Sequence, residues 1–168
     1  MPRFKVLEII GKFLISFVAV VVVQGILAYK FKVFTYFDLP LICTVYYGFT
    51  LGNPIASIVM GSSLGLMQDS LSAAVLGTNG FSKTLIGYLA ASAAAKFAVD
   101  QPVTRIFALF LFTLGDGLLV TMLALMTSPA ANTTYSGALG GWLLSATFNT
   151  LLGLILFGYR DRLSNATA

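Results

Sequence analysis

No residue from 39 to 68 is charged, and most residues in this segment are apolar. At about 1.5 Å per residue, a helix of this length exceeds an ordinary membrane span, yet the segment is short for two spans. Gly52, Asn53 and Pro54 interrupt it. Because proline lacks an amide hydrogen and restricts the residue before it, we expect two short helices, 39–51 and 54–68, that meet at this turn. Their ends need protein or a polar cavity around them.

The composition of the whole chain is that of an integral membrane protein. The chain has 168 residues, of which 58% are hydrophobic and 10% are charged, and its mean hydropathy is +0.91. This charge content excludes a water-soluble globular fold. Because the apolar stretches are long and do not alternate, helices are favoured over a barrel. We therefore expect an all-α integral membrane fold in a single domain, residues 1–168.

Six segments are expected to span the membrane: 13–29, 39–51, 54–68, 80–99, 103–127 and 137–159. The first has the charge layout of a signal peptide or an anchor, and Ile26-Leu27-Ala28 makes a poor cleavage site, which favours an anchor. With six spans and both termini cytoplasmic, seven basic residues lie inside and three outside. If 39–68 formed one span, four basic residues would lie inside and six outside. The positive-inside rule therefore favours six spans. The inner set is Arg3, Lys5, Lys12, Lys96, Arg105, Arg160 and Arg162, and the outer set is Lys30, Lys32 and Lys83.

Several kinds of active site are excluded or disfavoured. Histidine is absent, which removes the commonest general base and most zinc or haem ligation. The single cysteine, Cys43, can form neither an intrachain disulfide nor a thiolate cluster, and its apolar neighbours indicate packing within a span. The net charge of +4 is explained by basic residues at span ends, so no nucleic-acid partner is implied. We expect no catalytic, metal or cofactor site, and an intramembrane enzyme is disfavoured.

Asp116 is the costliest residue of the chain, because it lies near the middle of the span 103–127. One interpretation is an ion or proton site, or a polar contact to a partner helix. The other is a carboxyl group that is protonated or hydrogen-bonded inside the bundle. A proton relay is disfavoured, because no histidine and no second acid at mid-membrane depth accompany it.

Asp69 ends the third span, where an acid opposes the helix dipole and needs compensation. Lys83 lies one turn into the next helix, on the same expected side of the membrane. We expect a pair between the two side chains that orders the loop 69–79. The alternative is that Asp69 caps a turn beginning at Ser70.

A face of small residues runs along the span 80–99. In lipid such a face lets another helix approach closely, so we expect a packing surface, for the fold itself in preference to an external partner. Its members follow one another at steps of three or four residues: Gly80, Thr84, Gly87, Ala91, Ala94 and Ala98. The GxxxG pairs Gly48/Gly52, Gly61/Gly65 and Gly137/Gly141 are a weak signal, because about 1.5 such pairs would arise by chance among 16 glycines.

The segment 65–91, GLMQDSLSAAVLGTNGFSKTLIGYLAA, carries a family resemblance. It resembles the most recognisable part of the rod-shape-determining protein MreD family, and the length, basic start, six spans and basic finish of the chain fit as well. The features concerned are Gln68-Asp69 at the end of an apolar helix, Gly77 in a short loop, Asn79-Gly80, and Gly87-Tyr88-Leu89 in the next helix.

The resemblance implies a non-catalytic scaffold in the bacterial inner membrane. It would link MreC with the MreB filament, RodA and its penicillin-binding protein in the cell-elongation machinery. The family is also held to share the six-helix fold of the substrate-binding subunits of energy-coupling-factor transporters, so the alternative is a vitamin-binding transporter subunit. The few polar groups near the candidate pocket, Asp69, Asn79 and Ser82, favour the scaffold.

Overall fold

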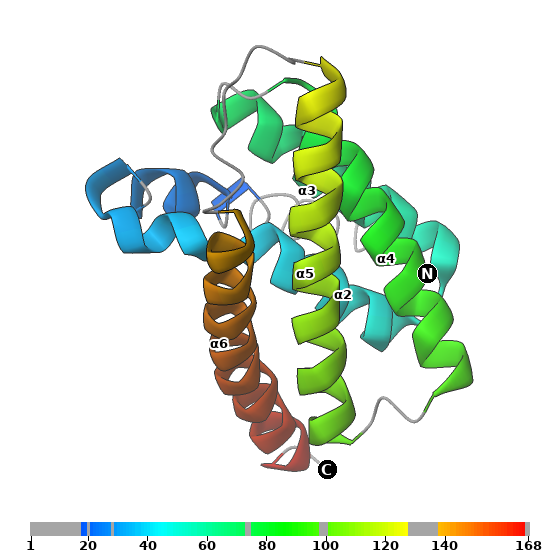
Figure 1. Cartoon of the computed structure of the whole chain (residues 1–168). Coiled ribbons are helices and arrows are strands. Elements are labelled where there is room, and N and C mark those ends of the chain that lie inside the picture. Colours follow the sequence, from blue (N-terminus) through cyan, green and yellow to red (C-terminus); the bar gives the residue numbers. More distant parts are fainter. Residues whose placement is uncertain are drawn as a thin grey trace, which may run out of the picture.

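The computed structural model describes residues 18–19, 21–27, 29–72, 75–97, 101–127 and 138–166, with only the backbone described for 32, 138 and 159–166. The basic residues Arg3, Lys5 and Lys12 and the first part of the predicted span 13–29 lie outside the described residues. The described part of that span is helical, and no strand occurs in the ranges given above. Figure 1 shows the further elements, which are η1 (Lys32–Tyr36), α2 (Leu39–Leu51), α3 (Pro54–Ser72), α4 (Thr78–Lys96), α5 (Pro102–Thr127) and α6 (Ala138–Ala166).

The break at 52–54 lies where the sequence predicts it, and α2 has the predicted bounds. Gly52 adopts a left-handed conformation with φ of 56°, and its N–H donates to the Gly48 carbonyl. The Asn53 side-chain oxygen accepts from the N–H groups of Ile55 and Ala56, at 3.0 and 3.3 Å. The turn therefore satisfies backbone donors that would otherwise be exposed at the start of α3.

The connection between α3 and α4 is shorter than predicted. α3 continues past residue 68 to Ser72, and α4 begins at Thr78 and ends at Lys96 instead of covering 80–99. Gly77 precedes α4 with φ of 97°, a left-handed conformation that glycine adopts without steric cost. Asp69 consequently lies in the last turn of α3 and not in a loop.

Two helices are long and apolar enough to cross a membrane, among the residues that the structure describes. They are Pro102–Thr127, with mean hydropathy 2.1, and Leu139–Gly158, with mean hydropathy 1.5. α5 matches its predicted bounds within one residue, whereas α6 continues beyond residue 159 to Ala166. α2 has only 13 residues. The number of membrane passes therefore remains a prediction.

The helices α2, α3 and α5 pack around α4, and the pair α3–α4 is the most extensive. α5 and α6 lie side by side (Figure 1). Burial of apolar side chains from four helices forms the main core. Its fully or nearly buried members are Leu41, Ile42 and Val45 of α2, Ile86 and Ala90 of α4, Leu109 of α5 and Phe157 of α6.

The aromatic segment before α2 packs against α6. The ring centroid of Phe37 lies 5.0 Å from that of Phe148 and 5.4 Å from that of Phe34. The Gln24 side chain holds the end of this segment, because it donates to the Phe37 carbonyl and accepts from the Leu39 N–H, both at 2.9 Å. These contacts fix the position at which α2 begins.

Candidate functional site

Lys83 lies at the centre of a buried polar cluster. Its side chain is fully buried, and its Nζ lies 2.8 Å from Asp38 Oδ2 and 3.6 Å from Asp116 Oδ2. Nζ also donates to Asn79 Oδ1 at 3.2 Å. An ammonium group has three hydrogens to donate, and three acceptors surround this one. The lysine thereby joins α4 to α5 and to the beginning of α2.

Asp38 has two structural roles besides its ion pair. Its Oδ1 accepts from the Leu41 N–H at 3.0 Å, so that Asp38 caps the N-terminus of α2. Its own N–H donates to Asn149 Oδ1 of α6 at 2.8 Å. Pro40 in the first turn of α2 has no N–H that needs a partner. The residue therefore couples the start of α2 to both α4 and α6.

Asp116 points into the bundle from the middle of α5. It is 7% exposed, and its Oδ1 accepts from the Ser82 hydroxyl at 2.6 Å. Thus both Ser82 and Lys83 of α4 contact one carboxylate of α5. This hydrogen bond is what one of the two sequence-based interpretations expects, and an ion, proton or partner role for Asp116 stays a prediction.

The cluster does not balance its formal charges. One ammonium group faces two carboxylates, at Asp38 and Asp116. A buried charge is stable only when it is paired and hydrogen-bonded, and removal of one partner from a buried pair is strongly destabilising. Lys83 therefore holds the start of α2 and the middle of α5 against α4, and its loss would leave two carboxylates uncompensated.

Asp69 receives its compensation from the N-terminus of α4. Its carboxylate accepts from the N–H groups of Gly77, Asn79 and Gly80 at 2.9, 3.1 and 3.1 Å, and from the Asn79 side-chain amide at 2.8 Å. N–H groups and the positive end of the helix dipole favour an anion at this position. The last turn of α3 thus caps the beginning of α4.

The structure corrects the two sequence-based interpretations of Asp69. No salt bridge joins Asp69 to Lys83 among the described side chains, because the ammonium is directed to Asp38 and Asp116. Asn79 lies between them, since its amide donates to Asp69 and its oxygen accepts from Lys83. Asp69 also does not cap a turn at Ser70, because α3 continues through that residue.

The small-residue face of α4 packs inside the molecule. A Cβ atom at Gly87 would lie 2.6 Å from the Ser57 carbonyl oxygen of α3, and one at Gly80 would lie 2.9 Å from a Leu66 methyl group. Ala91 is fully buried, whereas Ala94 is half-buried. Ala98 lies outside the described residues. The face therefore serves the fold over most of its length.

The GxxxG pair of α3 has the packing role that the sequence analysis did not give it. A Cβ atom at Gly61 would overlap the Lys83 carbonyl group, and one at Gly65 would overlap the Asn79 carbonyl group. Close backbone approach of this kind is the usual function of such pairs in membrane helices. Gly61 and Gly65 consequently place α4 so that Asn79 and Lys83 reach their partners.

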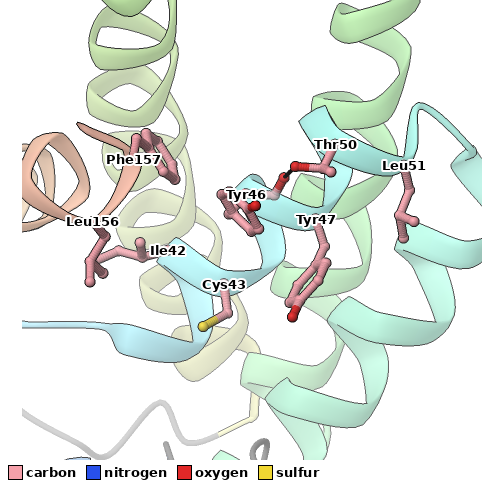
Figure 2. A pocket seen from close by; sticks show the side chains of 8 residues that line it. All are labelled: Ile42, Cys43, Tyr46, Tyr47, Thr50, Leu51, Leu156 and Phe157. Atoms are coloured by element: carbon pink, nitrogen blue, oxygen red, sulfur yellow. Dashed lines mark hydrogen bonds between the residues drawn. The ribbon is translucent and has the colours of Figure 1, made fainter. Parts of the chain in front are cut away.

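A second feature is an apolar groove of about 450 Å³ between α2 and α6. Figure 2 shows Ile42, Cys43, Tyr46, Tyr47, Thr50 and Leu51 of α2 on one side and Leu156 and Phe157 of α6 on the other. Cys43 is half-buried there, in agreement with a packing role. Among the described residues, no group of three His, Cys, Asp or Glu side chains could hold a metal ion.

A family model described as rod shape-determining protein MreD matches residues 7–162. The chain belongs to the MreD family. No curated protein and no solved structure matched it. The match confirms the resemblance seen in segment 65–91. Proteins of the MreD family are membrane proteins with a role in cell shape. The similarity to substrate-binding subunits of energy-coupling-factor transporters stays a prediction.

In this MreD chain, three of the polar residues singled out from the sequence lie close to one another: Asp69, Lys83 and Asp116. Sequence reasoning missed Asp38 and Asn149. An acid followed by Leu39-Pro40 is a signal for a helix N-cap, and Asn149 is a polar residue within an apolar helix. Those signals mark both positions as special, but they do not say which residues meet.

Proposed function

We propose that the chain is a non-catalytic scaffold subunit of the bacterial cell-elongation complex in the inner membrane, with both termini in the cytoplasm. It links MreC, the MreB filament, RodA and the penicillin-binding protein that works with RodA. The family match over residues 7–162 is the observation that carries this proposal. A vitamin-binding transporter subunit is the alternative.

The packing of the described helices supports a scaffold. Lys83 and its partners tie α2, α4, α5 and α6 together, and Gly61 and Gly65 hold α3 against α4. Such contacts between these helices hold them in one arrangement, and a scaffold needs a fixed geometry for the surfaces that it presents.

The partner surface is proposed to lie on the outer faces of α5 and α6. The small-residue face of α4 is used internally, so it is not free to receive another helix at Gly87 or Ala91. α5 and α6 instead expose apolar side chains along their length, including Phe107 and Leu118 of α5 and Leu143 of α6. These faces would contact lipid where no partner covers them.

The test replaces the resident copy of the gene in a rod-shaped bacterium by a tagged and depletable one. Depletion is expected to round the cells, and MreC is expected to copurify with the tagged protein in mild detergent. Rod-shaped cells after depletion, together with copurification of an ATPase coupling module, would replace the scaffold by the transporter alternative.

A further inference from the structure

A small polar cavity of about 120 Å³ lies beside the Lys83 cluster. This volume is about that of four water molecules in the liquid, taken at roughly 30 Å³ each. Its wall combines the segment before α2 with parts of α3, α5 and α6. The polar side chains that matter for its chemistry are those of Asp38, Gln68, Asp116, Ser145 and Asn149.

The carboxylates of the cluster face this cavity, and the ammonium does not. The side chains of Asp38 and Asp116 are 18% and 9% exposed, whereas that of Lys83 is 0% exposed. Both acids line the cavity. Since two formal negative charges face one positive charge, the cavity offers a place where a second cation would complete the pairing.

Asn149 supplies an independent indication of a bound molecule. It is fully buried, and its Oδ1 accepts from the Asp38 N–H, which identifies the other terminal atom as the Nδ2 donor. That Nδ2 has no hydrogen-bond partner among the described residues. A buried donor without an acceptor is energetically costly. A molecule in the cavity would therefore be stabilised by an oxygen atom that accepts from Asn149 and by a cationic group near the acids.

The rest of the wall favours an organic cation over a metal ion. Tyr36, Phe37 and Trp142 line the cavity, and aromatic rings attract ammonium groups. No three metal-ligating His, Cys, Asp or Glu side chains come together among the described residues. A bare metal ion would offer no acceptor to the Asn149 donor.

The geometry points to a binding site for a small ammonium group that carries an oxygen atom a few bonds away. The ammonium would donate to Asp38 and Asp116, and the oxygen would accept from Asn149 Nδ2. This chemistry is that of a 2-aminoethanol unit, either as the headgroup of phosphatidylethanolamine or as the free amine. The site goes beyond the proposed scaffold role and does not depend on it.

The test uses the full chain, delipidated in detergent, and measures lipid binding by native mass spectrometry. Phosphatidylethanolamine should bind about tenfold more tightly than phosphatidylcholine, because a trimethylated ammonium has no hydrogen to donate to the carboxylates. Displacement of the lipid by free ethanolamine would identify the headgroup chemistry as sufficient. If ethanolamine does not displace it, the preference between the two lipids assigns the site to the lipid.

Two variants and a control complete the test. Asp116→Asn balances the formal charges without the ligand, so the preference for phosphatidylethanolamine should fall below twofold. Ser145→Met fills the cavity and gives the same result if Asp116→Asn does not fold. Thr147→Val changes an exposed hydroxyl that bonds only to its own helix, and it should keep the full preference. Equal affinity for the two lipids in the unaltered protein, or tighter binding of phosphatidylglycerol, would overturn the proposal.

Discussion

The ammonium of Lys83 lies 2.8 Å from the carboxylate of Asp38, the residue that caps α2. A side chain buried in α4 thereby fixes the position where a different helix begins. The same nitrogen lies 3.6 Å from Asp116 of α5. The arrangement makes the stability of several helix contacts depend on one charged group.

Replacing Lys83 by methionine keeps most of the side-chain volume and leaves the two carboxylates unpaired. We expect Lys83→Met to cost about 3–5 kcal/mol of folding free energy, the usual effect of breaking a buried ion pair. Thermal unfolding in detergent and the amount of protein in the membrane measure it. Lys96→Met is the matched control, because Lys96 is exposed at the end of α4.

A triple variant tests whether the stability lost in Lys83→Met has an electrostatic origin. When Asp38→Asn and Asp116→Asn are added to Lys83→Met, the uncompensated charges disappear, and asparagine still caps a helix. The triple variant should therefore be more stable than Lys83→Met alone. A further decrease in stability would show that packing of the lysine, and not its charge, holds the helices.

Asp69→Ala removes the acceptor of the four hydrogen bonds at the start of α4. The unpaired N–H groups should cost about 1–3 kcal/mol in stability. The amides of Gly77, Asn79 and Gly80 should exchange faster with deuterium. Ser70→Ala is the control, because the Ser70 hydroxyl bonds only to the Leu66 carbonyl of its own helix.

A charge swap separates this arrangement from a direct ion pair. Asp69→Lys combined with Lys83→Asp should not recover the stability lost in the single variants, since each residue has different partners. Recovery in the double variant would mean that Asp69 and Lys83 interact directly, as the sequence suggested.

The close contact of α3 with α4 predicts opposite outcomes for two glycines. Gly61→Ala places a methyl group against the Lys83 carbonyl and should destabilise the protein by about 1–3 kcal/mol. Gly140→Ala meets nothing within 4 Å and should be neutral or slightly stabilising, because alanine has the higher helix propensity. The measurement is the thermal unfolding midpoint of each variant. Equal midpoints would contradict the close approach of α3 to α4 at Gly61.

Membrane topology can be tested with cysteine labelling, since Cys43 is the single cysteine of the chain. In a Cys43→Ala background, Ala131→Cys should react with a membrane-impermeant maleimide in intact spheroplasts. Ala168→Cys should react only after permeabilisation. The reverse pattern, or labelling of both sites from outside, would contradict six spans with cytoplasmic termini.

The parts of the fold that the sequence predicts are those controlled by local rules. Gly52-Asn53-Pro54 determines where α2 ends and α3 begins, because each residue has a backbone preference that acts without tertiary context. Asp116 stands out because charge within an apolar helix is costly wherever the helix packs. Lys83 stands out as an opposite charge close in sequence to Asp69. These signals depend only on neighbouring residues.

The pairing within the site depends on contacts between distant segments. Lys83 could reach Asp69 or Asp38, and which acid it meets depends on how α2 and α3 pack against α4. The extension of α3 to Ser72 then directs Asp69 to the N–H groups of α4. Neither fact follows from helix periodicity, so the cluster could be predicted only as a set of residues.

The length of α2 bears on the bilayer around the protein. A 13-residue helix is about 20 Å long, whereas the hydrocarbon layer is about 30 Å thick. In the proposed six-span topology α2 would be shorter than the hydrocarbon layer, and local thinning of the membrane relieves such a hydrophobic mismatch. Since thinning has an energetic cost, the six-span topology would favour the protein in regions of the cell membrane that are already thin.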